Sequence, residues 1–409
     1  MRTVPALLLL LAFSVMSGCG GDDPLSPAEG TVVSGDFFVS TQAGLDSMAT
    51  LAEGSIIING GLVLEGGPFT SLAPLQNIIS INGGLAIDAN LSLTSLNGLH
   101  NLESLQGGLF IVDNHALTSI QALSKLTSVG GNLLIENNRA LGSLRGLDGI
   151  QQVEGYLEVD ANPLLATLTG LDKVGVVGDN MVIANNEGLV SLAGLDSLFG
   201  VVGAIEIDGN DALASLTGLD SLSVVGTDLV IIENEALTSL AALGHLSSVT
   251  GLVLIGSNPL LTSLTGLDLI TTIESDLVIG NNAGLTSLTG LETLQSVTGS
   301  LVIDSHLSLP NLDGLDKLIR VEADVVITKN TALAAFTGID SLADIWGNLI
   351  ISNNPMLSSF DGLGTVSSLQ GELLINQNSA LPTALAQTFA DTLAGRGFTG
   401  KVTIENNLP

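Results

Sequence analysis

The sequence predicts an all-β fold: a parallel β-helix of about 13–14 coils with a 24-residue period and a short helix at each end. Asparagine recurs every 24 residues, and apolar residues recur in the same phase. A period this strict indicates a solenoid, because each coil must stack on the preceding one. The asparagines in phase are Asn90, Asn114, Asn138, Asn162, Asn186, Asn210, Asn234, Asn258, Asn282, Asn330, Asn354 and Asn378, with His306 in the slot between Asn282 and Asn330.

Each coil begins with a predicted β-strand that leads to the asparagine. Counting from the asparagine as zero, position −3 is Ile or Val and position −5 is aliphatic, as in Leu85 and Ile87. This alternation places −5 and −3 on one face of the strand and −4 on the other. Leucine at +3 and apolar residues at +6, +9, +12 and +15 complete seven interior positions per coil.

The asparagine follows the strand where the backbone turns. A buried carboxamide there can bond the backbone of its neighbours and the asparagines of adjacent coils. We therefore interpret the asparagines as a structural ladder without a catalytic or ligand-binding role. Glycine at +8, as at Gly146, and at +17, as at Gly155, marks corners that need a positive φ or a close approach of two coils.

The chain divides into five predicted segments. Residues 1–18 form a lipoprotein signal peptide, and 19–35 form a lipidated cysteine with a flexible tether. Residues 36–60 form the N-terminal cap, with a strand over 36–39 and a helix over about 42–52 that begins at Thr41. Residues 61–380 form the repeat solenoid. Residues 381–409 form the C-terminal cap, with Pro382 at the first position of a helix over 383–394 and a strand over 401–405.

Composition excludes several classes of function. Ten Lys and Arg stand against 41 Asp and Glu, so the chain lacks the cationic footprint of a nucleic-acid-binding protein. The sole cysteine, Cys19, precludes an intramolecular disulfide. The four histidines occupy different coil positions and form no metal set, and no cofactor motif is present.

The N-terminus resembles a bacterial lipoprotein signal. Arg2 supplies a positive charge, an apolar stretch runs over 6–15, and Met16-Ser17-Gly18-Cys19 resembles a lipobox in which Cys19 is lipidated. Methionine stands where leucine is more usual, and an ordinary cleaved signal is the alternative. Lipidation predicts a protein anchored in the bacterial cell envelope, at the outer membrane or cell surface, with no other membrane contact.

The unit G-x-L-x-I-x-x-N-x-x-L, present from Gly131 through Asn138 to Leu141, resembles the receptor L domain and also leucine-rich repeats. The resemblance runs from about residue 36 to the end. It implies a right-handed parallel β-helix and roles in ligand binding or cell-surface adhesion. The chain lacks the cysteines of the animal members and is much longer than one L domain, so their ligand contacts cannot be transferred.

Position −4 faces outward, yet it stays apolar over seven consecutive coils. At about 4.8 Å per coil the row is about 29 Å long. It is either stabilising β-branched packing or a partner-binding surface. We call this row the apolar stripe: Val230, Leu254, Val278, Val302, Val326, Ile350 and Leu374.

Carboxylates replace the apolar residues nearer the N-terminus. Glu158 and Asp160 share one coil, Glu206 and Asp208 lie two coils further on, and Glu136 is nearby. Two coils separate the pairs by about 10 Å, too far for one metal ion without a ligand between them. We interpret these residues as a solvated acidic face, with polysaccharide chemistry or calcium binding as the alternative.

Aspartate also recurs at +10 after a Gly-Leu pair. A stacked row of carboxylates could hold calcium, but an aspartate before a short helical turn is a natural N-cap, and we expect the cap. The row contains Asp148, Asp172, Asp196, Asp220, Asp268, Asp316 and Asp340.

Three functions remain open. The first is a lipid-anchored binding or adhesion protein whose solenoid face recognises a protein or glycan. The second is a structural envelope spacer that associates weakly with itself through the stripe. The third, which we do not favour, is an enzyme acting on polysaccharides.

Overall fold

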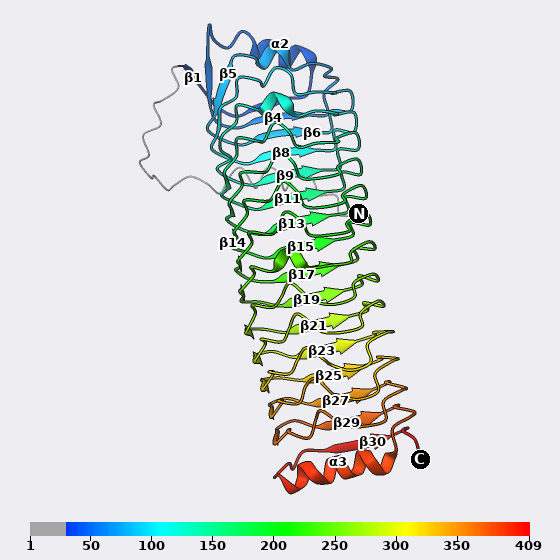
Figure 1. The fold of residues 1–409 in the computed structure, drawn as a ribbon. Coiled ribbons are helices and arrows are strands. Elements are labelled where there is room, and N and C mark those ends of the chain that lie inside the picture. Colours follow the sequence, from blue (N-terminus) through cyan, green and yellow to red (C-terminus); the bar gives the residue numbers. More distant parts are fainter. Residues whose placement is uncertain (1–29) are drawn as a thin grey trace. The chain divides into compact units, whose positions relative to one another are not determined.

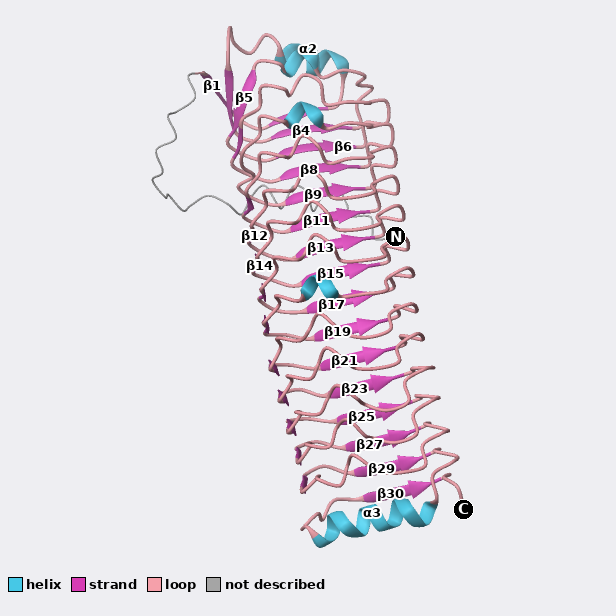
Figure 2. Ribbon diagram, in the orientation of Figure 1, coloured by secondary structure: helices cyan, strands magenta, loops and turns pink. Residues whose placement is uncertain are grey.

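A computed structural model describes residues 30–409. The predicted signal peptide, Cys19 and the first part of the tether lie outside the described residues. The described chain is an all-β parallel solenoid of about 14 turns with two short helices, which confirms the predicted fold class (Figures 1 and 2). It forms two compact units. One extends to Leu189 and includes Ala193–Leu198, and the other comprises Val190–Leu192 and Phe199–Pro409.

The principal sheet of the first unit consists of parallel strands in the order β2-β4-β6-β8-β9-β11-β13. A strand forms at positions −5 to −2 because −5 and −3 are apolar and enter the interior. The bounds are β2 (Phe37–Val39), β4 (Leu62–Glu65), β6 (Leu85–Asp88), β8 (Leu109–Val112), β9 (Leu133–Glu136), β11 (Leu157–Asp160) and β13 (Met181–Ala184).

The second unit repeats this arrangement. Its principal strands follow one another in the order β15-β17-β19-β21-β23-β25-β27-β29-β30, again all parallel. The bounds are β15 (Ile205–Asp208), β17 (Leu229–Ile232), β19 (Val253–Gly256), β21 (Leu277–Gly280), β23 (Leu301–Asp304), β25 (Val325–Thr328), β27 (Leu349–Ser352), β29 (Leu373–Asn376) and β30 (Val402–Glu405).

A second side of the solenoid is built from parallel strands that are four residues long in the first three coils and two residues long, at positions +14 and +15, in the later coils. In the first unit these are β1 (Thr31–Ser34), β3 (Ile56–Asn59), β5 (Ile78–Ile81), β7 (Ser104–Leu105), β10 (Gln152–Val153) and β12 (Val176–Val177). In the second unit they are β14 (Gly200–Val201), β16 (Val224–Val225), β18 (Ser248–Val249), β20 (Thr272–Ile273), β22 (Ser296–Val297), β24 (Arg320–Val321), β26 (Asp344–Ile345) and β28 (Ser368–Leu369).

The third side consists of turns, with 3₁₀ turns at η1 (Ala73–Leu75), η2 (Gln121–Leu123) and η3 (Ala241–Leu243). The interior holds the seven apolar positions of each coil. In one representative coil all seven are fully buried: Leu277, Ile279, Leu285, Leu288, Leu291, Leu294 and Val297. At about 2 kcal/mol gross per buried aliphatic side chain, this repeated burial dominates the stabilisation of the fold.

The asparagine side chains are fully buried and bond the backbone of their own coil and of the preceding one. Asn114 is representative. Its amide nitrogen Nδ2 donates to Ile87 O at 2.7 Å and Val112 O at 2.8 Å, and its backbone N–H donates to Asn138 Oδ1 at 3.1 Å. Each carboxamide therefore satisfies backbone groups that the turn would otherwise leave buried and unpaired.

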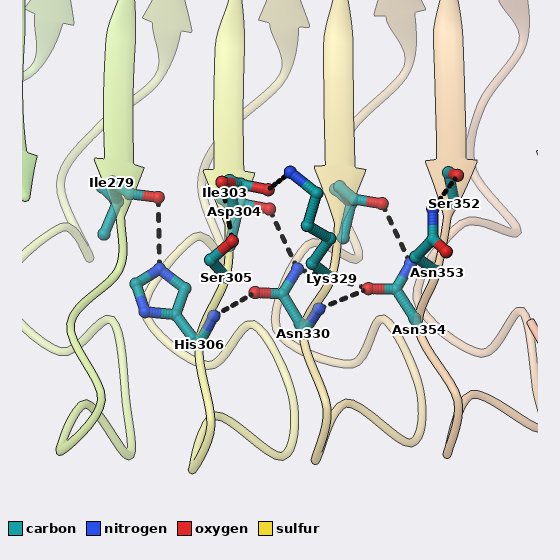
Figure 3. A network of polar contacts seen from close by, with 11 residues as sticks. Ile279, Ile303, Asp304, Ser305, His306, Lys329, Asn330, Ser352, Asn353 and Asn354 are labelled. Atoms are coloured by element: carbon teal, nitrogen blue, oxygen red, sulfur yellow. Dashed lines mark hydrogen bonds and ion pairs between the residues drawn. The ribbon is translucent and has the colours of Figure 1, made fainter.

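His306 fits into this row and bonds in a different way (Figure 3). Its backbone N–H donates to Asn330 Oδ1 at 3.1 Å, as an asparagine would. Its ring nitrogen Nε2 lies 3.1 Å from Ile279 O, and Nδ1 lies 3.1 Å from Asn282 O. Burial lowers the pKa of His306, although both carbonyls and Asp304 act in the opposite sense. A neutral ring carries one N–H, so only one of these two ring contacts can then be a hydrogen bond.

The N-terminal cap is the helix α2 (Gln42–Met48), which is shorter than the predicted 42–52. Its N-cap is Thr41, whose hydroxyl accepts the N–H of Gly44 at 3.1 Å. Leu45 and Met48 are buried against the end of the interior.

The C-terminal cap is the helix α3 (Thr383–Gly395), which lies alongside β30 (Figure 1). Pro382, which was predicted at the first helical position, is instead the N-cap, with φ −59° and ψ 129°. The Phe360 ring stacks on Phe389 of α3, with ring centroids 4.4 Å apart, and so joins the helix to the last coils.

Candidate binding surface

The apolar stripe is continuous in the structure of the second unit. Its seven residues are register partners along neighbouring strands from β17 to β29, beginning with Val230 opposite Leu254 and ending with Ile350 opposite Leu374. Each side chain is half-buried, because its neighbours one coil away cover part of it. The stripe is thus a tightly packed row of side chains whose outer atoms remain accessible.

Two glycines lie beside the stripe in the outward-facing position −2. Gly256 follows Leu254 in β19, and Gly280 follows Val278 in β21. Neither has a positive φ, and a Cβ on Gly280 would approach nothing closer than Asp304 O at 3.8 Å. Gly280 is therefore not required by the local backbone. A strand glycine of this kind often marks a place where a ligand or another backbone approaches closely.

Two more apolar side chains, which are not part of the predicted stripe, widen the surface at this end. Leu252 precedes β19, and Ile232 is the register partner of Gly256. Both are half-buried. Their phase in the repeat could have identified them. Leu252 stands two residues before position −4 of its coil, and Ile232 stands two residues after position −4 of its own coil.

A polar rim borders the stripe at position −6. Asp228, Asp276 and Asp324 each accept a backbone N–H of the next coil through Oδ1, at distances of 2.6–2.7 Å. On the other border Asp304 pairs with Lys329, whose Nζ lies 3.4 Å from Oδ1. An apolar centre with a hydrogen-bonded polar rim is the usual arrangement of a protein-binding surface.

The outward face of the first unit differs from the expected solvated acidic face. Val63, Ala86, Phe110, Val112 and Leu134 form a buried apolar cluster at outward positions −4 and −2, and Tyr156 packs against it. The repeat pattern did not predict this cluster. Carboxylates that adjoin it are consequently less hydrated than a freely exposed row would be.

Glu136 shows the effect most clearly. The pKa of Glu136 is raised from 4.5 to about 7, mainly by burial and then by the charges of Asp160, Glu158, Asp113 and Asp88, in that order. Burial also raises the pKa of Asp88 to about 6, with smaller contributions from Asp113 and Glu65. At neutral pH Glu136 is therefore only partly ionised.

The other predicted carboxylates do not assemble into a metal site. Glu158 and Asp160 lie in β11 of the first unit, and Glu206 and Asp208 lie in β15 of the second. Among residues 30–409 no group of three or more His, Cys, Asp or Glu side chains could hold a metal ion.

The aspartates at +10 cap a turn, but in a different way from the one expected. In Asp148 the carboxylate oxygen Oδ2 accepts the N–H of Gly146, two residues earlier, at 2.7 Å. The expected N-cap would instead accept an N–H that follows the aspartate. The same backward bond occurs at Asp172, Asp196, Asp220, Asp268, Asp316 and Asp340.

Comparison with known proteins supports the fold and a broad class of function. Residues 56–146 match the family model of the receptor L domain, a shorter stretch than the resemblance over residues 36–409. The match includes the unit from Gly131 to Leu141. A comparison with curated proteins finds no match. The receptor L domain and the solenoid are compatible with a ligand-binding surface protein.

No described helix combines the length and the apolar character needed to cross a membrane.

Proposed function

We propose that this protein is a lipid-anchored component of the bacterial cell envelope that binds or adheres to a protein or glycan partner. The partner would lie on the apolar stripe of the second unit. The lipid on Cys19 would be the only attachment to the outer membrane or cell surface.

The observation that carries this proposal is the stripe itself, together with its setting. Seven apolar side chains lie in register, and the stripe is flanked by Gly280 and by a rim of hydrogen-bonded carboxylates. Packing alone accounts for a β-branched row, but it does not require a glycine with space for a side chain beside that row. Because Asp228, Asp276 and Asp324 dominate the rim, a partner with neutral or cationic groups around an apolar centre fits best.

The test compares soluble residues 31–409 with the double variant Val278→Lys, Val302→Lys in pull-downs from envelope and host extracts. Position −4 points outward, so circular dichroism should remain unchanged while partner retention is lost. Val182→Lys is the matched control, because Val182 occupies the same strand position in the first unit. It should retain the partner.

A second variant tests the position of Gly280 beside the stripe. Gly280→Val adds a good strand former where the structure has space, so the fold should persist while an approaching partner is obstructed. Thr328→Val changes the same outward position two coils further on and should have a smaller effect.

If partners are retained by every variant, the stripe serves only sheet packing. If light scattering instead shows that the double variant removes self-association without affecting any other partner, the envelope-spacer function is favoured.

A further inference from the structure

The N-terminal end of the solenoid presents two consecutive strands with an open edge. β1 and β2 are the terminal strands of their sheets, and among the described residues each pairs on one side only, with β3 and β4 respectively. Only Gly35 and Asp36 separate them. β1 matches β3 over all four residues, so this edge has the same length as the paired strands within the sheet.

The backbone of this edge is arranged to accept another strand. Thr31, Gly35 and Phe37 donate their N–H groups inward, to Ser55 O, Asn59 O and Gly61 O at 2.8, 3.1 and 2.9 Å. Donors alternate in direction along a parallel ladder, so the N–H groups of the intervening residues point away from the sheet. These residues include Val32, Ser34 and Phe38.

Most side chains at the edge are apolar. Val32 is 57% exposed and Phe38 is 63% exposed. Val33 and Phe37 face the interior and remain half-exposed, because no further described coil covers them. Proteins usually protect such edges with lysine, proline, a bulge or a covering element. β1 and β2 contain none of these residues, and the carboxylate of Asp36 at the corner is occupied by the N–H of Gly61 at 2.7 Å.

The C-terminal end differs. β30 is also a terminal strand, but α3 packs alongside it, and the charged residues Lys401 and Glu405 lie at its two ends. α2 covers the interior at the N-terminal end, where it contacts η1, and leaves the strand edges of β1 and β2 unpaired within the described chain.

The charge around the open edge selects its partner. The sequence contains no Lys or Arg from residue 30 to residue 124, whereas Asp36, Asp46, Glu53 and Glu65 all lie in the first two coils. A second copy of the chain would bring another uniformly acidic end to this one. An extended cationic segment would gain both strand hydrogen bonds and charge complementarity.

We propose that the β1–β2 edge binds an extended, Lys- or Arg-containing segment of another polypeptide by strand addition. The segment would pair with the outward N–H and C=O groups. Its apolar residues would cover Val33 and Phe37 on one face, and the alkyl stems of its Lys or Arg side chains would cover Val32 and Phe38 on the other. This site is separate from the apolar stripe and does not depend on the proposed function.

The test uses the full-length protein and a fluorescently labelled peptide in which Val or Thr alternates with Lys. Fluorescence anisotropy should show saturable binding that weakens as NaCl is added. A peptide with Glu in place of Lys, and a Lys peptide with alternate backbone nitrogens methylated, should both bind at least about tenfold more weakly.

The decisive variant is Val32→Pro with Ser34→Pro. Both residues direct their N–H groups outward, so proline removes the edge donor without removing a bond to β3. Peptide affinity should fall at least about tenfold while thermal unfolding is unchanged. The matched control is Val402→Pro on the terminal strand β30, whose N–H also points away from its sheet, and it should retain wild-type affinity.

Equal binding of the methylated peptide would mean a purely electrostatic contact and would overturn the proposal. So would full affinity in the double proline variant, or absence of peptide binding. Concentration-dependent dimerisation that the double proline variant abolishes, with no peptide binding, would assign the edge to a second copy instead. If the double proline variant unfolds, Ser34→Pro alone serves as the test.

Discussion

At the residue scale, His306 shows how the ladder accommodates a different side chain. The imidazole retains a contact with Ile279 O that an asparagine Nδ2 makes elsewhere, and the His306 N–H keeps its bond to Asn330. An imidazole has no oxygen, however, so one bond of the ladder is lost. The lost bond is the one that the Asn282 N–H would donate to a carboxamide oxygen at position 306. The imidazole instead places a ring nitrogen next to Asn282 O.

His306→Asn should therefore stabilise the protein by about 1 kcal/mol. The carboxamide can donate to Ile279 O and accept from Asn282 N–H, as Asn282 does for Asn258 at 2.9 Å. Urea unfolding of the variant and wild type measures the difference. His306→Gln is a control, because its longer side chain cannot place the amide in the ladder. A loss of stability in His306→Asn would show that the imidazole has a role of its own.

Glu136 gives the stability of the protein a particular pH dependence. Its pKa is raised from 4.5 to about 7 in the folded protein, so protonation favours folding. Its contribution to stability is complete below pH 4.5 and is lost as the pH rises through about 7. We expect the urea midpoint to fall over this range, and to fall less in Glu136→Gln. Equal pH profiles for the two proteins would contradict the assignment.

At the element scale, the corner at +8 decides how one coil passes over the next. Gly146 has a φ of +117°, and a Cβ there would lie 2.2 Å from Ile120 O in the preceding coil. The sequence predicted this corner from the recurrence of glycine alone. It did not predict the backward bond from Gly146 N–H to Asp148, because the sequence does not show which neighbouring donor a carboxylate will face.

Gly146→Ala should destabilise the fold by about 2 kcal/mol or more, since it combines an unfavourable φ with a backbone clash. Gly142→Ala is the matched control. Gly142 lies in the same coil without a positive φ, and its Cβ would meet only Leu164 O at 3.8 Å. It should be neutral or slightly stabilising. Thermal unfolding of both variants checks this, and similar losses in the two would refute the role of the corner.

At the scale of the whole molecule, the net charge of −31 opposes compaction. We expect the thermal unfolding midpoint to rise as ionic strength increases from about 0.01 M to about 0.15 M. Over that range the screening length falls from about 30 Å to about 8 Å, so repulsion among carboxylates weakens. A midpoint that stays constant or falls would mean that short-range packing outweighs the charge throughout.

The ends of the solenoid show a limit of prediction from the repeat. The ladder continues to Asn407, which accepts the N–H of Asn378 at 3.0 Å and donates to Ile375 O at 2.9 Å. Asn407 stands 29 residues after Asn378, because α3 is inserted between them. The 24-residue phase therefore does not predict Asn407.

The sequence alone determined the solenoid, the interior rows and the register of the apolar stripe. Stacked coils must repeat their contacts, so a fixed period in the chain becomes a straight row in space. Only the tertiary structure revealed the left-handed backbone at position −1, where residues as different as Ala89, Glu233 and Lys329 have φ of 54–56°. It alone also showed the buried cluster around Phe110 and the open edge of β1 and β2. Residue type does not specify these features, because they depend on which neighbouring chain segment covers each position or leaves it uncovered.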